Sequence, residues 1–142
     1  MIVLSILAVI TAGITAWIAW RQYATTRLQT KQALYSKRLE VYLRVKDFLG
    51  KCLCEKIRDT DVVEFNDSVS EAPFLFDRTI DDYIDKIYHK AMLLAGLQAA
   101  PAPPQSKKLT EMKIVREWLS NEYRTVRSHF SAYLTFAKKE ST

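Results

Sequence analysis

Glycine and cysteine are scarce in this chain. Three glycines among 142 residues are too few for a glycine-rich loop that cradles phosphates. The two cysteines, Cys52 and Cys54, lie on different faces of a predicted helix, which disfavours a disulfide between them. No cysteine and histidine have the spacing of a metal site, and no serine, histidine and aspartate suggest a catalytic triad. We therefore expect no metal site and no cofactor.

Charge is absent from one long stretch of the sequence. Residues Ile2 to Trp20, IVLSILAVITAGITAWIAW, contain no Asp, Glu, Lys or Arg. A helix rising about 1.5 Å per residue would give this run a length of roughly 28 Å, close to the hydrocarbon thickness of a bilayer. The sequence predicts one transmembrane helix at residues 2–20, with the lipid bilayer as its partner.

The alternative for this run is a cleaved secretory signal, which carries basic residues before the apolar segment and small residues at a cleavage site after it. Neither feature is present. The run ends instead in an aromatic and basic edge suited to lipid headgroups: Trp17, Trp20, Arg21 and Tyr23. Further basic residues follow, namely Arg27, Lys31, Lys37 and Arg38. By the positive-inside rule, we expect the rest of the chain to lie in the cytoplasm; the resemblance to small bacterial proteins given below implies that the membrane is the bacterial inner membrane.

The overall charge adds little about partners. The chain has 21 basic and 16 acidic residues, a formal net charge of +5. Much of the basic surplus follows the run, where anionic lipid attracts it. The charge therefore leaves nucleic-acid binding open.

Small residues recur within the run. Ala8, Ala12 and Ala16 are spaced every four residues, which places them on one face of a helix. Such a face lets transmembrane helices approach closely, so it predicts a homo-oligomer; the alternative is that alanine is simply common in membrane spans.

The remaining sequence predicts helices and no strand with clear alternation. Proline is absent from Tyr23 to Ile57, which predicts a long helix over residues 21–57. The sequence of residues 58–73 predicts a connection between two helices, with a short helical turn near Val62 to Phe65. A second helix follows, capped by Asp77 or Thr79, and a proline-rich loop over Ala99 to Lys108 precedes a third helix from Leu109 to Lys138.

The apolar spacing identifies the predicted core of these helices. The stripe of the second helix is Ile80, Ile84, Ile87, Ala91 and Leu94, and that of the third is Met112, Val115, Leu119, Val126, Phe130, Tyr133 and Ala137. The predicted fold is all-α: a transmembrane helix continues into a long helix, and residues 58–140 complete a cytoplasmic bundle of about three helices. Residues 21–140 are expected to form one domain.

The third predicted helix contains the sequence Arg124-Thr-Val-Arg-Ser-His129, with an R-x4-H spacing. This spacing resembles the motif of HEPN domains, small helical bundles that often act as metal-independent ribonucleases after dimerising. The resemblance implies that His129 moves protons at the ribose 2′-hydroxyl while Arg124 steadies the phosphate. The residue after Arg124 is Thr, where active members usually have Asn, Asp or His, and the alternative is two solvated polar residues.

The whole-chain pattern resembles small bacterial single-pass proteins, on the segments WRQYATTRLQTKQALYSKRLEVY and FLFDRTIDDYIDKIYHKA. In outline it is also similar to the HEPN-like membrane protein that accompanies some type VI CRISPR loci. That resemblance implies a self-assembling, pore-forming accessory or effector protein in phage defence. The alternatives are a membrane-tethered HEPN-type ribonuclease and a passive scaffold that binds a protein partner through the apolar face of Leu34 to Leu53.

Overall fold

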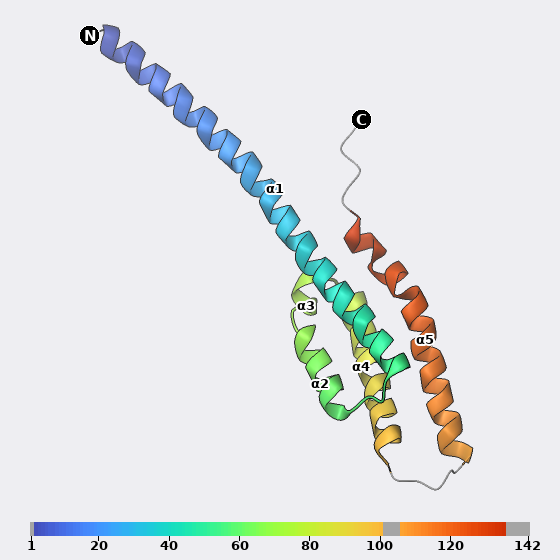
Figure 1. Cartoon of the computed structure of the whole chain (residues 1–142). Helices are drawn as coiled ribbons and strands as arrows, with labels where there is room; N and C mark the ends of the chain where they lie inside the picture. The colour runs from blue at the N-terminus through green and yellow to red at the C-terminus, as the bar shows by residue number, and fades with distance from the viewer. Residues whose placement is uncertain (1, 101–105, 136–142) are drawn as a thin grey trace. The chain divides into compact units, whose positions relative to one another are not determined.

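The computed structural model describes residues 2–100 and 106–135, without the side chains of residues 2–5, 7, 24 and 106. Within these ranges the regular elements are all α-helices, which confirms the all-α prediction. They are α1 (Ile2–Cys54), α2 (Asp59–Ser68), α3 (Ala72–Leu75), α4 (Arg78–Ala99) and α5 (Ser106–Leu134), as Figure 1 shows. The chain forms two compact units, Met1–Leu34 and Tyr35–Thr142, each with its own contacts. The predicted boundary between residues 20 and 21 separates the transmembrane segment from the rest of the chain, and it stays a prediction.

Helix α1 contains the whole segment predicted as helical at residues 2–20 and most of the one predicted at residues 21–57, because it ends at Cys54. The three missing residues have a packing reason. Ile57 is buried with 1% of its surface exposed, and its backbone N–H donates to Oε1 of Gln98 at 2.8 Å. The chain therefore leaves the helix early, because this exit buries Ile57 and fixes the following segment against α4.

The connection predicted at residues 58–73 is mostly helical, which corrects the sequence prediction. Helix α2 covers ten residues and α3 covers four. The predicted turn at Val62 and Phe65 is the middle of α2, where both side chains are buried. The Phe65 ring stacks on Phe48 of α1 with 4.0 Å between ring centroids. Tertiary packing therefore holds a segment whose many polar residues suggest a loop.

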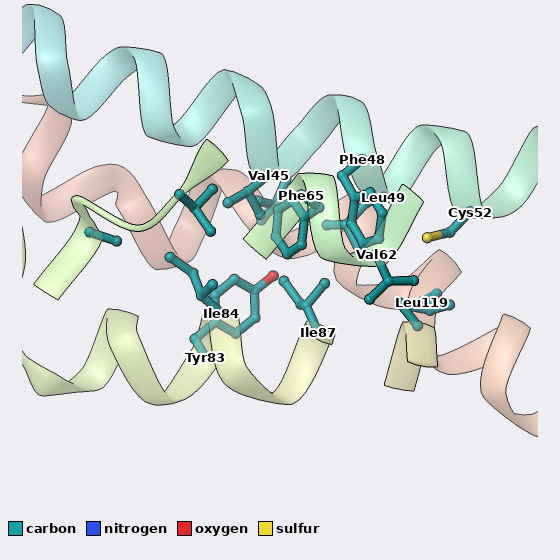
Figure 2. Close-up of a cluster of buried hydrophobic side chains, with 14 of the residues drawn as sticks. Val45, Phe48, Leu49, Cys52, Val62, Phe65, Tyr83, Ile84, Ile87 and Leu119 are labelled. Atoms are coloured by element: carbon teal, nitrogen blue, oxygen red, sulfur yellow. The ribbon is translucent and has the colours of Figure 1, made fainter. Parts of the chain in front are cut away.

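One buried core joins the helices of the Tyr35–Thr142 unit. Helix α4 packs against α5, α2 and α3. Figure 2 shows Val45, Phe48, Leu49 and Cys52 of α1 facing side chains from α2, α4 and α5. The predicted stripe of α4 is confirmed, since Ile80, Ile84, Ile87, Ala91 and Leu94 are all buried. On α5, Val115, Leu119, Val126 and Phe130 are buried, while Ala137 lies outside the described residues.

The predicted cap of α4 is confirmed at Asp77. Its carboxylate accepts hydrogen bonds from the backbone N–H groups of Thr79 at 3.1 Å and Ile80 at 3.4 Å. The Ile80 N–H also donates to the backbone carbonyl of Asp77 at 3.2 Å, and the negatively charged carboxylate is stabilised by the positive end of the helix dipole. The helix α5 begins at Ser106, three residues before the predicted start.

A buried carboxylate fixes the start of α2. Asp61 exposes 6% of its surface, and its Oδ1 accepts from Nζ of Lys51 at 2.9 Å. Its Oδ2 accepts from the backbone N–H of Arg58 at 2.9 Å and lies 3.4 Å from Nε of the same residue. These contacts, with the Lys51 hydrogen bond first, hold the pKa of Asp61 well below its ordinary value.

The lowered pKa of Asp61 predicts a pH-dependent stability. A carboxyl group with a lowered folded-state pKa stabilises the protein above its ordinary pKa, and this stabilisation is lost as the pH falls through the folded-state value. We expect Asp61→Asn to lower the free energy of unfolding at pH 7, and the difference from wild type to shrink as the pH falls below 4. Urea unfolding between pH 7 and pH 3 measures this. Asp59→Asn, at an exposed site in the same turn, is the control; a pH-independent loss in Asp61→Asn would contradict the account.

The two thiols have different surroundings. Cys52 is buried in the core and Cys54 is exposed, and both are free. Burial raises the pKa of the Cys52 thiol to about 12. The thiolate is the reactive species, so we expect iodoacetamide at pH 8 to label Cys54 rapidly and Cys52 only after denaturation. Mass spectrometry of peptides measures both rates, with Cys54→Ser as the control; equal labelling in the folded protein would contradict this packing.

Candidate functional site

The uncharged run of α1 presents its described apolar side chains to the surroundings. Seven large apolar residues expose between 42% and 72% of their surface: Ile6, Val9, Ile10, Ile14, Trp17, Ile18 and Trp20. Removing apolar surface from water is worth about 25 cal/mol per Å², and soluble monomers rarely expose a continuous apolar patch of this extent. The run is therefore a surface that favours an apolar covering.

The described hydroxyl groups within the run are bonded to the helix itself. Thr11 Oγ1 donates to the carbonyl of Ala8 at 2.9 Å. Thr15 Oγ1 lies 2.8 Å from the carbonyl of Thr11 and 3.0 Å from that of Ala12. In hydrocarbon an unsatisfied polar group costs several kcal/mol, so donors bonded within the helix suit such surroundings.

An aromatic and basic edge closes the run. The Arg21 guanidinium lies over the Trp17 ring, 5.4 Å from its centroid. Trp20 and Tyr23 expose 72% and 67% of their surfaces. Amphipathic rings and arginine side chains of this kind are typical of the headgroup region of a membrane, where one end of the residue is apolar and the other is wet. The predicted interface residues thus lie within two turns of one helix.

The alanine face is open. Ala8, Ala12 and Ala16 are exposed, and a Cβ added at Gly13 would meet no atom within 4 Å. Within the Met1–Leu34 unit this face of α1 is open, and small residues on such a face let a second helix approach closely.

Across the helical residues whose side chains are described, no segment combines the length and the apolar character that crossing a membrane requires.

The structure does not bring the two residues of the R-x4-H motif together. Arg124 and His129 are both exposed on α5, and no described interaction joins them. Five residues separate the side chains by about 140° around a straight helix, so they point in different directions. Cleavage by a single chain would need both groups at one phosphodiester, so a role in RNA chemistry depends on a second chain and stays a prediction.

His129 has close neighbours that sequence analysis missed. Its ring stacks on Tyr83 of α4, with 4.1 Å between centroids and 22° between planes. Its Nε2 lies 3.6 Å from Oε2 of Glu122, seven residues earlier on α5. The i, i+7 spacing of Glu122 and His129 was visible in the sequence, whereas the contact with Tyr83 depends on how α4 packs on α5. The structure thus gives the His129 ring a packing role.

The same neighbours include two buried polar atoms. Tyr83 exposes 7% of its surface, and neither its hydroxyl nor Oε2 of Glu122 makes a hydrogen bond within the described residues. Burial first, and then the nearby Glu122 carboxylate, raise the pKa of Tyr83. The hydroxyl therefore stays protonated at neutral pH and acts as a neutral polar group.

Among residues 2–100 and 106–135, no group of three histidine, cysteine, aspartate or glutamate side chains is arranged to hold a metal ion.

Comparisons of the chain with protein-family models, curated proteins and solved structures find no match.

Proposed function

We propose that this chain is a membrane-anchored protein, held in the bilayer by residues 2–20 and carrying the helical unit Tyr35–Thr142 in the cytoplasm. The observation that carries the proposal is the uncharged run of nineteen residues, whose described apolar side chains are exposed along α1. The proposed span is the whole run from Ile2, including residues 2–5 and 7, whose side chains are not described. Arg21, Arg27 and Lys31 follow it and support a cytoplasmic position for what comes next.

Self-assembly is the second part of the proposal. The exposed Ala8, Ala12 and Ala16 face of α1 would pack against the same face of other copies. The protein would then act as an accessory or effector whose activity depends on assembly at the membrane. A pore has less support than an anchor, because the described threonine hydroxyls of the run donate to their own helix rather than being available to line a channel.

Two observations argue against the alternative functions, a scaffold and a ribonuclease. A scaffold binding a partner through the apolar face of Leu34 to Leu53 would need that face free, yet Val41, Val45, Phe48 and Leu49 are buried in the core of their own unit. A ribonuclease needs Arg124 and His129 at one phosphate, and one chain does not present them so. It predicts RNA cleavage by wild type and none by His129→Ala at unchanged assembly; an inert wild type would contradict it.

Alkaline extraction of membranes from cells expressing the full chain tests the anchor. Carbonate at pH 11 removes proteins held by charge, so we expect the chain to stay in the membrane pellet. Light scattering of the detergent-solubilised chain then tests assembly. We expect a multiple of the monomer mass, reduced by Ala12→Leu and unchanged by Val9→Leu, which alters an exposed residue outside the alanine face. Recovery in the carbonate supernatant would contradict the anchor, and a monomer would contradict assembly.

A further inference from the structure

A groove lies between α1 and α5 within the Tyr35–Thr142 unit, and the proposed anchor makes no use of it. Its volume is about 420 Å³, within the range of ligand sites. Residues of α1 spaced three or four positions apart form one wall, and residues near the end of α5 form the other. The lining is Tyr35, Leu39, Tyr42, Lys46, Arg127, Ser131, Leu134 and Thr135.

The two ends of this groove differ in chemistry. Contacts of the Tyr42 ring with Phe130, 5.5 Å between centroids, and of the Arg38 guanidinium with the Tyr133 ring at 5.6 Å show that the two helices run antiparallel here. Lys46 and Arg127 therefore share one end. The other end has Tyr35 and Leu39 of α1 opposite Leu134 of α5. The distance along α1 from Tyr35 to Lys46 is about 16 Å at 1.5 Å per residue.

No described carboxylate neutralises the cationic end. Among residues 2–100 and 106–135, none of the residues that line the groove is an aspartate or glutamate. The ion pairs among described residues involve Lys37, Arg44, Lys51, Arg58 and His129, and neither Lys46 nor Arg127 takes part in one. Lys46 is also half-buried, and no described carboxylate supplies it with a counter-charge. A bound anion would supply that charge.

The geometry points to a binding site for an anionic single-chain amphiphile, with its headgroup at Lys46 and Arg127 and its hydrocarbon chain along Leu39 and Leu134. The hydroxyl of Ser131, beside Arg127 in the lining, donates to the carbonyl of Ser128 at 2.8 Å, so the headgroup contacts come from Lys46 and Arg127. A nucleic acid fits less well, because a phosphate chain crossing the groove would need cations along its length and both cations lie at one end. A free amphiphile and a lysophospholipid from the bilayer share this chemistry.

Equilibrium binding of radiolabelled dodecyl phosphate to the full chain tests the site. The chain is kept in a non-ionic amphipol, which holds it in solution whether or not residues 2–20 enter membranes, so the result is independent of the anchor. We expect saturable binding of one molecule per chain. Inorganic phosphate has the anionic group without the hydrocarbon chain, and dodecanol has the chain without the charge. Neither should compete at equal concentration. Competition by added lysophosphatidylglycerol at similar concentration would identify bilayer lipid as a second source of the same ligand.

Variants locate the bound molecule. Lys46→Gln with Arg127→Gln should weaken binding by about tenfold or more, because charge-assisted hydrogen bonds are lost. The matched control, Lys86→Gln with Lys113→Gln, removes the same charge at exposed sites outside the groove and should bind as wild type. Leu39→Trp fills the apolar end and should abolish binding, with circular dichroism checking the fold. Equal binding in all variants, or displacement by a single-stranded RNA but not by lysophosphatidylglycerol, would overturn the proposal.

Discussion

Replacing Ile10 and Ile14 with lysine is expected to release the full chain from lipid bilayers. Both residues lie near the middle of the uncharged run and expose 52% of their surface. A lysine at the centre of a membrane helix costs about 2.5–3.5 kcal/mol on insertion scales, so two cost about 5–7 kcal/mol together. Flotation with phosphatidylcholine and phosphatidylglycerol vesicles measures the bound fraction, and we expect it to fall from nearly all of the protein to a small remainder.

The control is the same pair of substitutions further along α1. Leu28 and Leu34 are also exposed apolar residues, at 62% and 40%, but they lie beyond the aromatic and basic edge at Trp20 and Arg21. Leu28→Lys with Leu34→Lys should float with the vesicles as wild type does, since the added charges face headgroups and water. If the Ile10 and Ile14 variant also floats in 1 M salt, the run is not the anchor.

Phe130→Ala is expected to remove about 3–5 kcal/mol from the free energy of unfolding, the cost of a large cavity in a packed core. Phe130 is fully buried, and its ring meets Tyr42 of α1 at 5.5 Å and Phe76 at 5.3 Å between centroids. One ring thus joins α5 to both of these segments. Small domains have a free energy of unfolding of about 5–15 kcal/mol, so the variant should lose much of its stability. Urea unfolding of the full chain in non-ionic detergent, followed by circular dichroism, measures the loss.

The matched control makes the same chemical change at the surface. Phe74 in α3 exposes 88% of its surface, so Phe74→Ala should change the free energy of unfolding by less than about 0.5 kcal/mol. Similar losses in the two variants would contradict the packing of α5 against α1.

Local signals in the sequence were sufficient for helices that carry their own caps and stripes. The α4 prediction succeeded because Asp77 is a strong cap and because Ile80 to Leu94 repeat with helical spacing. Helix α2 was missed because its sequence, DTDVVEFNDS, is rich in residues that favour turns, and its helical state depends on buried Val62 and Phe65 and on Asp61 bonded to Lys51. Contacts between distant segments carry that helix, and no single window of sequence contains them.

The features of the candidate site also differ in whether the sequence alone can identify them. The uncharged run and its edge at Trp17 and Arg21 are properties of continuous sequence, so the order of the amino acids is enough to identify them. The surroundings of His129 are different, because Tyr83 comes from another helix. The groove at Lys46 and Arg127 was missed for the same reason, since eighty-one positions separate the two residues and only the antiparallel packing of α1 and α5 brings them to one end of it.

Spin-label accessibility along α1 measures whether the uncharged run at residues 2–20 enters the hydrocarbon of a bilayer. Single cysteines at Ile10, Ile14, Leu28 and Leu34 are labelled in a Cys54→Ser background, in which buried Cys52 stays unreactive, and the full chain is placed in vesicles. The account predicts that labels at 10 and 14 collide with oxygen, which concentrates in hydrocarbon, and that labels at 28 and 34 collide with a water-soluble nickel complex. Collision with nickel at all four positions would contradict the membrane anchor.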